Sequence, residues 1–224
     1  MVTNSWFHRP LRMKKAAKEQ FDRWAEGYDK SILQRLIFTP AHDLIFGELN
    51  LDAPCHILDI GCGTCVFGFA IAAQSPSSRI FCMDLSHEMA QRAKLKRDRC
   101  RALMDTVGMV KITIADSEHL PYADGSLDYV TCSNSFHHYP RQEKVVREMY
   151  RVLKPGGKVI IVDGCRDTLI GRFIYDCIVR ILEGHIRHLS SGEFRALLAG
   201  CGFGQLRQKT SYRGLPLLLT AATK

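Results

Sequence analysis

The sequence lacks a long hydrophobic run: no stretch approaches the roughly 18 apolar residues that a membrane-spanning helix needs. Its first residues, MVTNSWFHRPLRMKK, contain no apolar core of the kind found in secretory signals. Internal repeats and low-complexity segments are also missing. A chain of 224 residues is long enough to bury a full core. We therefore expect one compact globular domain in the cytoplasm.

Two cysteine arrangements that define small extracellular domains and zinc-binding proteins are absent. The nine cysteines are odd in number and scattered through apparent strands and helices, which argues against a disulfide framework. Cys62 and Cys65 form one C-x-x-C pair, but no second pair exists to complete a four-ligand zinc site. We expect small buried thiols in a reducing compartment and no metal site.

Negative charge is in the minority, since 31 Lys and Arg face 23 Asp and Glu and leave a net charge of +8. The positive charge gathers in HRPLRMKKAAK near the start, in KLKRDRCR at 94–101 and in the final thirty residues. Such a balance can attract nucleic acid, anionic lipid or an acidic partner. More often it marks a solvated basic surface, so charge alone assigns no partner.

A short apolar run at 56–60, HILDI, ends directly in front of two glycines spaced G-x-G. The run is typical of a buried strand. Gly61 and Gly63 let the backbone turn where a side chain would obstruct the turn or a ligand. The following segment, VFGFAIAAQS, has helix-forming composition. Strand, glycine turn and helix together are the layout of a nucleotide-binding loop.

Strands and helices alternate along the rest of the chain. Further strands are predicted at 79–85, 111–116, 127–134 and 158–164, and helices at 86–108 and 141–153. The final stretch predicts two more strands joined at Gly214. Such alternation favours a Rossmann-like, doubly wound α/β fold with a mostly parallel sheet and helices on both faces. In such sheets a ligand binds at the carboxyl ends of the strands.

Two segments fall outside this alternation. Residues 1–54 are helical and are expected to form an N-terminal cap on a domain at 55–224. Within that domain, 166–189 is expected to be a helical cap insertion. It carries apolar pairs at 169/170, 173/174, 177/178 and 181/182, which predict one broad helix face buried against the domain or covering the site.

The glycine turn does not suit a dinucleotide. A dinucleotide fingerprint needs G-x-G-x-x-G, and the third glycine is replaced here by Val66. The carboxylate of Asp59 beside the turn would repel a pyrophosphate and would favour a cationic group. S-adenosylmethionine, with an amino group, a sulfonium and no phosphate, fits better than NAD. Acids also end the next two strands: Asp84 can accept both ribose hydroxyls, and Asp116 can accept the adenine amine.

The motifs ILDIGCGTC, CMDLSHEM, IADSEHLPYADGSLDYVTCSNSFHHYP and EMYRVLKPGGKVIIVD resemble class I S-adenosylmethionine-dependent methyltransferases. The similarity is greatest to the small-molecule branch that includes the ubiquinone and menaquinone C-methyltransferases. It covers roughly residues 55–164 strongly, with weaker similarity at EQFDRWAEGYD and SSGEFRALLAGCGF. It implies a seven-stranded sheet with an antiparallel last strand, S-adenosylmethionine as cofactor and S-adenosylhomocysteine as product.

The resemblance also implies roles for single residues. Gly61 and Gly63 would cradle the methionine end of the cofactor, and Asp59 would help to hold its amino group. Asp84 would hold the ribose, and Asp116 the adenine. The other residues expected around the cofactor lie beside these motifs or in the N-terminal EGYD: Tyr28, Cys62, Met83, Leu85, Met89, Ser117, Ser133 and Asn134. The family often has glycine where this chain has Cys65, a small residue that should be tolerated.

Candidates for the chemical step follow the fourth strand. His137 and His138 lie where the reactive methyl group should point, and histidine has a suitable pKa for a general base near neutrality. His185 and His188 in the cap are weaker candidates. Asp163, at the end of the fifth strand, could orient a base or the substrate. The sequence does not decide between His137 and His138, and packing or capping roles remain open for both.

The motifs that the sequence lacks exclude several classes of methyl acceptor. The chain has SNSFHHYP after the fourth strand, not the Asn/Asp-Pro-Pro-aromatic motif of exocyclic-amine methyltransferases. The Pro-Cys pair of cytosine C5 enzymes and the paired glutamates of arginine methyltransferases are also absent. A small acceptor remains, and the apolar caps favour a hydrophobic one, such as a quinol-like ring or a lipid. The basic N-terminus could then contact an anionic membrane surface.

Three alternatives stay open. The positive charge would also suit an RNA acceptor, although no RNA-binding domain is visible. The chain could instead be a non-catalytic subunit that binds the cofactor and activates a partner. Cys132 and Cys165, both near strand ends, would permit a thiol or arsenite acceptor.

Overall fold

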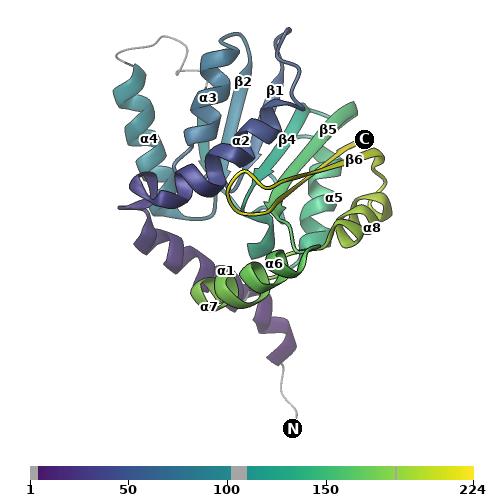
Figure 1. Cartoon of the computed structure of the whole chain (residues 1–224). Coiled ribbons are helices and arrows are strands. Elements are labelled where there is room, and N and C mark those ends of the chain that lie inside the picture. The colour runs from purple at the N-terminus through teal and green to yellow at the C-terminus, as the bar shows by residue number, and fades with distance from the viewer. Residues whose placement is uncertain (1–4, 102–109, 185) are drawn as a thin grey trace.

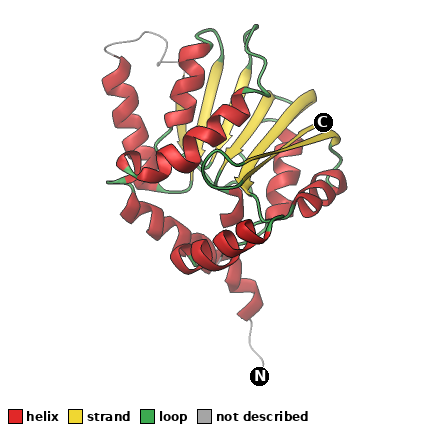
Figure 2. Cartoon of the chain, in the orientation of Figure 1, coloured by secondary structure: helices red, strands yellow, loops and turns green. Residues whose placement is uncertain are grey.

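The computed structural model describes residues 5–101, 110–184 and 186–224. Its centre is a seven-stranded sheet with the order β3-β2-β1-β4-β5-β7-β6 (Figure 2). The strands run parallel except β7, which is antiparallel to both of its neighbours. Their bounds are β1 His56–Ile60, β2 Arg79–Asp84, β3 Val110–Ile114, β4 Leu127–Ser133, β5 Leu153–Gly164, β6 Gly204–Ser211 and β7 Leu217–Thr223. The predicted fold class is confirmed.

Helices cover both faces of the sheet because side chains alternate along each strand. One face receives Ile57, Ile160 and Val162 and packs against α2 (Thr39–Phe46), α3 (Val66–Gln74) and α4 (His87–Arg101). The other face receives Leu58 and Ile161 and packs against α5 (Gln142–Val152) and α8 (Ser191–Gly200). Burial on both faces explains why the central strands are continuous apolar runs in the sequence.

The remaining helices lie across the ends of the strands. α1 (Ser5–Trp24) runs beside the segment from α6 (Leu169–Arg172) to α7 (Arg180–Glu183), below the sheet in Figure 1. Short helical turns at Tyr28–Lys30, Gln34–Phe38 and Phe136–His138 connect this layer to the sheet. The carboxyl ends of the parallel strands point toward these helices, so they cover the edge where a ligand is expected.

Most predicted boundaries agree with the structure to within a few residues. The predicted helix at 86–108 is present as α4 up to Arg101, and its predicted end at 102–108 lies outside the described residues. β5 begins at Leu153, five residues earlier than predicted, because Leu153 still pairs with Leu127 of β4. The final two strands meet at a turn in which Gly214 has φ +116°, as expected of glycine there.

The prediction that the apolar face of 168–189 is buried against the domain is wrong. The segment forms α6, a π-helical stretch at Phe173–Val179 and α7. It packs through a different stripe, in which Gly171 and Tyr175 are buried and Glu183 is half-buried. The apolar pairs lie beside that stripe, and except for the half-buried Ile174 they remain exposed, with Leu169 at 85% and Ile181 at 82%. A four-residue repeat cannot tell which of the adjacent stripes of a helix faces the protein.

The helices of the described residues include none long and apolar enough to cross a membrane. This agrees with the absence of a long hydrophobic run in the sequence.

Candidate active site

A cavity with about 760 Å³ of empty space, its mouth included, lies at the carboxyl ends of β1, β2 and β4. The predicted site residues that line it come from five separate parts of the chain: Tyr28, Gly61, Gly63, Met83, Asp84, Leu85, Asp116, Ser117, Ser133, Asn134 and His138. The fold therefore brings together most of the residues predicted from the sequence.

The glycine turn after β1 is fixed by backbone contacts. The N–H groups of Gly61 and Cys62 both donate to the carbonyl of Met83, at 2.8 and 3.0 Å. A Cβ on Gly61 would lie 2.3 Å from the Ser135 hydroxyl, and Gly61 has φ +69°. Glycine is thus required here both by the turn and by the close approach of Ser135. No sequence pattern indicates that approach.

Cys65 occupies a glycine-like position in the same turn. Its φ is +64°, in the left-handed region that disfavours residues with a Cβ. It is nevertheless fully buried directly before α3. The structure therefore accommodates the cysteine in place of the family's glycine, as expected.

Two carboxylates at strand ends face the cavity, each already held by the backbone. Asp84 accepts from the N–H groups of Gly63 and Ser86, both at 2.8 Å. Burial raises the pKa of Asp84, and these hydrogen bonds oppose the shift. Asp116 accepts from the N–H of Glu118 at 3.0 Å and from the Lys14 ammonium at 2.6 Å. Burial alone would raise the pKa of Asp116, but Lys14 lowers it below its usual value.

Asp59 lies in a smaller pocket that adjoins the cavity and shares Tyr28, Gly61 and Ser133 with it. The Thr131 hydroxyl donates to its carboxylate at 2.9 Å, and only 2% of the residue is exposed. Burial, with a smaller contribution from the Cys65 thiol, raises the pKa of Asp59 to about 8. The acid is therefore largely protonated at neutral pH until a cation approaches it.

Besides Asp59, three further residues predicted for the site lie outside the main cavity. Cys62 lines the adjoining pocket beside Asp59. Met89 is buried in α4, behind the loop that carries Leu85. His137 is buried and turned toward β5.

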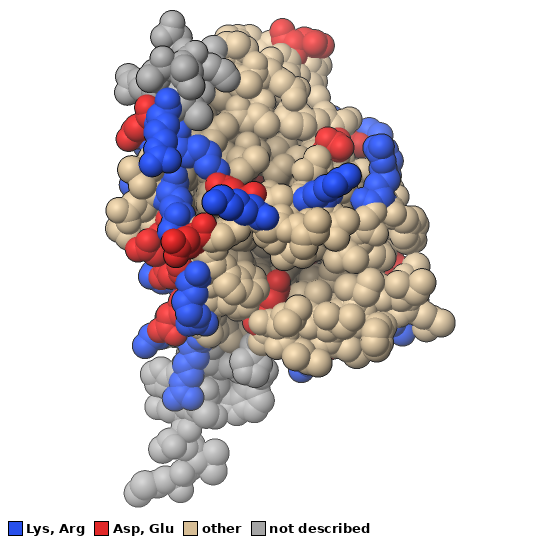
Figure 3. Space-filling model, turned by 60° about the vertical axis from the view of Figure 1, so that its left-hand side comes forward, with Lys and Arg blue, Asp and Glu red and all other residues tan. Residues whose placement is uncertain are grey.

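α1 contributes cavity residues that the sequence did not reveal. Lys14, Lys18 and Phe21 all line the cavity. Lys14 also pairs with Glu118 at 2.9 Å, so part of the N-terminal positive charge neutralises buried acids instead of facing solvent. Lys and Arg form a band down one side of the molecule with acids among them (Figure 3). A helical pattern near the N-terminus could have indicated a cap, but not which side chains enter the site.

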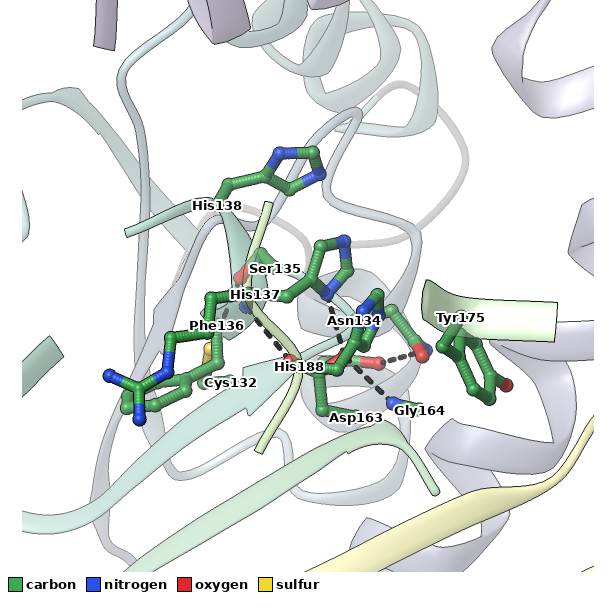
Figure 4. A network of polar contacts seen from close by, with 12 residues as sticks. Cys132, Asn134, Ser135, Phe136, His137, His138, Asp163, Gly164, Tyr175 and His188 are labelled. Atoms are coloured by element: carbon green, nitrogen blue, oxygen red, sulfur yellow. Dashed lines mark hydrogen bonds and ion pairs between the residues drawn. The ribbon is translucent and has the colours of Figure 1, made fainter. Parts of the chain in front are cut away.

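His137 is the centre of a buried ionic network (Figure 4). Its Nδ1 lies 2.6 Å from Asp163 and its Nε2 lies 3.2 Å from Glu183 of α7. Burial would lower the pKa of His137, but the two carboxylates raise it to about 10. His137 is therefore an imidazolium at neutral pH. A permanently protonated ring with both nitrogens engaged is unsuited to act as a general base.

Asp163 holds this network together. It accepts from the backbone N–H of His137 at 2.9 Å and from the N–H of Gly164 at 2.8 Å. The ring of His188 stacks on that of His137 with centroids 4.1 Å apart, and its Nε2 lies 3.5 Å from Asp163. Burial and the charge on His137 lower the pKa of His188 to about 3. His188 thus packs as a neutral ring; His185 lies outside the described residues.

His138 shares the contact with Glu183 but differs from His137 in orientation and in charge. Its ring turns away from Asp163 in Figure 4 and lines the cavity, 4.9 Å from the ring of Phe21. Its Nε2 lies 3.2 Å from Glu183. Burial and the charge on His137 lower the pKa of His138, which keeps the ring neutral at pH 7. With Nε2–H donated to Glu183, Nδ1 keeps its lone pair.

The donor set of the cavity fits S-adenosylmethionine. Asp84 and Asp116 can each accept further hydrogen bonds, because a carboxylate has about four lone-pair positions. Asp59 sits where a cationic amino group would ionise it, and the turn offers no cluster of free N–H groups for a phosphate, since those of Gly61, Cys62 and Gly63 are engaged. The chemistry of these residues thus suits a cationic nucleoside and not a dinucleotide.

The strand order with an antiparallel β7, the glycine turn and the acids at the strand ends define a class I methyltransferase fold. Residues 58–161 match the family model described as a methyltransferase domain. Over this region the chain is similar to class I S-adenosylmethionine-dependent methyltransferases of the ubiquinone and menaquinone C-methyltransferase type. The resemblance predicted from the sequence is confirmed.

The relatives illustrate the range of that family. A demethylmenaquinone methyltransferase of Geobacillus sp. (strain WCH70) is 34% identical over 126 residues, 55% of this chain and 51% of that protein. A malonyl-[acyl-carrier protein] O-methyltransferase of Geobacter sulfurreducens is 32% identical over 145 residues, 64% and 51%. The UbiE C-methyltransferase of Geotalea daltonii is 29% identical over 184 residues, 73% and 77%. The chain spans about half the length of the first two.

Solved structures agree on the fold. A chain of the complex between the Haloferax volcanii Trm112 methyltransferase activator and a putative methyltransferase has a TM-score of 0.74 at 20% identity, covering 91% of this chain and 96% of that chain. A possible histamine N-methyltransferase of Thermotoga maritima has a TM-score of 0.72, also at 20% identity, covering 92% and 99%. At this identity the similarity concerns the fold alone.

Proposed function

We propose that this protein transfers a methyl group from S-adenosylmethionine to a small hydrophobic acceptor. The observation that carries the proposal is a single cavity lined by Asp84 and Asp116, suited to a nucleoside, and by the neutral imidazole of His138. When bound, S-adenosylmethionine supplies a methyl group on a sulfonium that a nucleophile can displace.

Different residues of the chain bind different parts of the cofactor. Asp84 holds the ribose hydroxyls, Asp116 and Ser117 hold the adenine, and Asp59 holds the amino group as a carboxylate. Ser133 and Asn134 lie beside the methionine end, and the ring of Tyr28, 3.4 Å from the Cβ position of Gly63, covers the turn. Covering helices exclude water, which strengthens each of these interactions.

His138 is the proposed general base. Its Nδ1 takes the proton of a hydroxyl or acidic carbon as that atom attacks, and Glu183 stabilises the imidazolium that forms. His137 is a positioning residue: it stays charged and holds Glu183, so that Glu183 is fixed between the two rings. General base catalysis of this kind contributes about 10²–10⁴-fold.

A hydrophobic acceptor is supported by the apolar surface next to the cavity. Large apolar side chains of 169–182 remain exposed on the segment that also supplies Glu183: Leu169, Ile170, Phe173, Ile178, Ile181 and Leu182. The exposed Arg172 and Arg180 lie on the same segment. Apolar residues with arginines favour an anionic lipid surface, from which a quinol-like or lipid acceptor would enter.

Two experiments test these proposals. Purified protein and methyl-labelled S-adenosylmethionine are incubated with a cell extract, which is then separated into organic, aqueous, RNA and protein fractions. Label in the organic fraction supports a hydrophobic acceptor, whereas label in RNA or protein contradicts it. Absence of label with intact cofactor binding would contradict catalysis by this chain alone. Flotation with anionic and neutral vesicles tests the lipid surface, and equal recovery with both would contradict it.

A further inference from the structure

The glycine turn carries a cluster of three thiols that the proposed methyl transfer does not use. Cys62 and Cys65 come from the turn, and Cys82 comes from β2. The three sulfurs lie within 4.8 Å of one another. The sequence predicted no metal site because only one C-x-x-C pair is present, and the third thiol becomes a neighbour only when β2 pairs with β1.

The backbone makes room for the sulfurs. A Cβ on Gly68 would lie 2.3 Å from the Cys82 sulfur and 2.8 Å from the Cys65 sulfur, so only glycine in α3 leaves the cluster its space. Cys65 also keeps its thiol in this group at the cost of a left-handed backbone, with φ +64°. Two independent departures from ordinary packing thus serve the same cluster.

We propose that Cys62, Cys65 and Cys82 form a binding site for trivalent arsenic, a thiophilic centre that is satisfied by three sulfur ligands. Trivalent arsenic keeps a lone pair and binds three sulfurs in a pyramid, so at bond lengths of about 2.3 Å the sulfurs lie about 3.5 Å apart, and the cluster closes on the ion by side-chain rotation. No fourth His, Cys, Asp or Glu among the described residues joins the group. A closed tetrahedral zinc site, which needs four protein ligands, is therefore disfavoured.

The burial of the three thiols also favours an ion whose complex with them carries no net charge. Cys65 and Cys82 are fully buried, and Cys62 is half-buried at the pocket that also contains Asp59. A complex with zinc or copper(I) would leave net negative charge among three thiolates in a dry interior, which is costly. Trivalent arsenic bound to three thiolates is neutral. Its form in water, arsenous acid, is also neutral and enters without loss of ionic hydration.

The exchange balances without an oxidant or reductant. Each thiol gives its proton to one hydroxyl of arsenous acid, three arsenic–sulfur bonds replace three arsenic–oxygen bonds, and three water molecules leave. Arsenic stays trivalent.

The test uses the full chain, kept reduced, with arsenite as the probe and native mass spectrometry and calorimetry as readouts. We expect one arsenic atom bound per chain, with a mass that shows the loss of three hydrogens from the thiols of the protein. Cys65→Gly suits the left-handed backbone and should fold; together with Cys82→Ala it should weaken arsenite binding at least tenfold. The exposed Cys177 provides the matched control, Cys177→Ser, which should bind as the wild type does.

Unchanged arsenite affinity in Cys65→Gly would overturn the site, even if Cys82→Ala did not fold. Binding that needs Cys65 but survives Cys82→Ala would show a two-thiol site and overturn the three-thiol assignment. Zinc that binds one per chain and displaces arsenite would overturn the choice of ion. None of these readouts depends on methyl transfer, so the site stands or falls separately from the proposed function.

Discussion

The two sides of the cavity are held in different ways. On the cofactor side, Asp84 is fixed by the N–H groups of Gly63 in the turn after β1 and of Ser86 at its own strand end. On the acceptor side, His137 and His138 depend on Asp163 and on Glu183 from a distant helix. The first arrangement is made by backbone geometry and tolerates side-chain changes elsewhere. The second exists only while several charged side chains stay together.

The largest effect on turnover is expected from loss of the proposed general base on the acceptor side of the cavity. His138→Gln should lower the turnover number about 10²–10⁴-fold, because the base is lost, while cofactor affinity changes little. His137→Gln should act through Glu183 and have a smaller effect on turnover. Single-turnover kinetics and cofactor calorimetry on both variants measure the difference. Equal losses in the two variants would mean that His138 has no special role.

Asp163→Asn tests the ionic network of the acceptor side. It leaves the buried His137 imidazolium with one carboxylate and should lower the free energy of unfolding by about 3–5 kcal/mol. Since the pKa of His137 is raised to about 10 in the folded state, the stabilisation is complete below the unfolded value of about 6.5 and is lost as the pH rises toward 10. Urea unfolding between pH 6 and 10 should show this loss in the wild type and a weaker one in the variant.

Asp84→Ala should weaken S-adenosylmethionine binding by about 1–3 kcal/mol through lost charge-assisted hydrogen bonds to the ribose. Its effect on turnover at saturating cofactor should be smaller than that of His138→Gln. Calorimetry gives the affinity, and circular dichroism checks the fold. Unchanged affinity in a folded variant would refute the placement of the cofactor.

Asp59 should couple cofactor binding to pH. The folded protein holds the proton of Asp59 more tightly, with a pKa of about 8, than the unfolded chain does, with a pKa of 3.8. The protonated acid therefore stabilises the fold at low pH, and this contribution is lost as the pH rises from 3.8 to 8. A bound ammonium group reverses this preference, so about one proton should be released on binding at pH 7. Calorimetry in two buffers of different ionisation enthalpy measures the release. Asp59→Asn should abolish it; an unchanged release would place the ammonium elsewhere.

Substitutions on the exposed face of 169–182 should have the smallest effect on the free energy of unfolding. Leu169→Asn and Ile181→Asn should change the free energy of unfolding by no more than about 0.5 kcal/mol, as is usual for exposed positions. The same pair should reduce binding to anionic vesicles. Asn in place of the exposed Leu95 of α4 is the matched control. A large loss of stability in the 169–182 variants would show that the face is covered in solution.

The comparison also explains what could be predicted. The structure brings the glycine turn after β1, Asp84 at the end of β2 and Asp116 after β3 to one cavity, because strand ends in a parallel sheet meet at one edge, whatever the details of packing. The choice between His137 and His138 was not accessible, because it depends on carboxylates 26 and 46 residues away. The buried stripe of 168–189 was misassigned, because apolarity does not identify the face that packs.

The sequence by itself determined the alternation of strands and helices, the class of fold and the cofactor chemistry of the turn. These follow from local composition, glycine conformation and the periodicity of apolar residues, which act over a few residues. Only the tertiary structure decided the protonation of the two histidines, the entry of Lys14 and Phe21 into the cavity and the meeting of Cys82 with the C-x-x-C pair. Each depends on burial and on charges brought from distant segments, and neither quantity exists until the chain has folded.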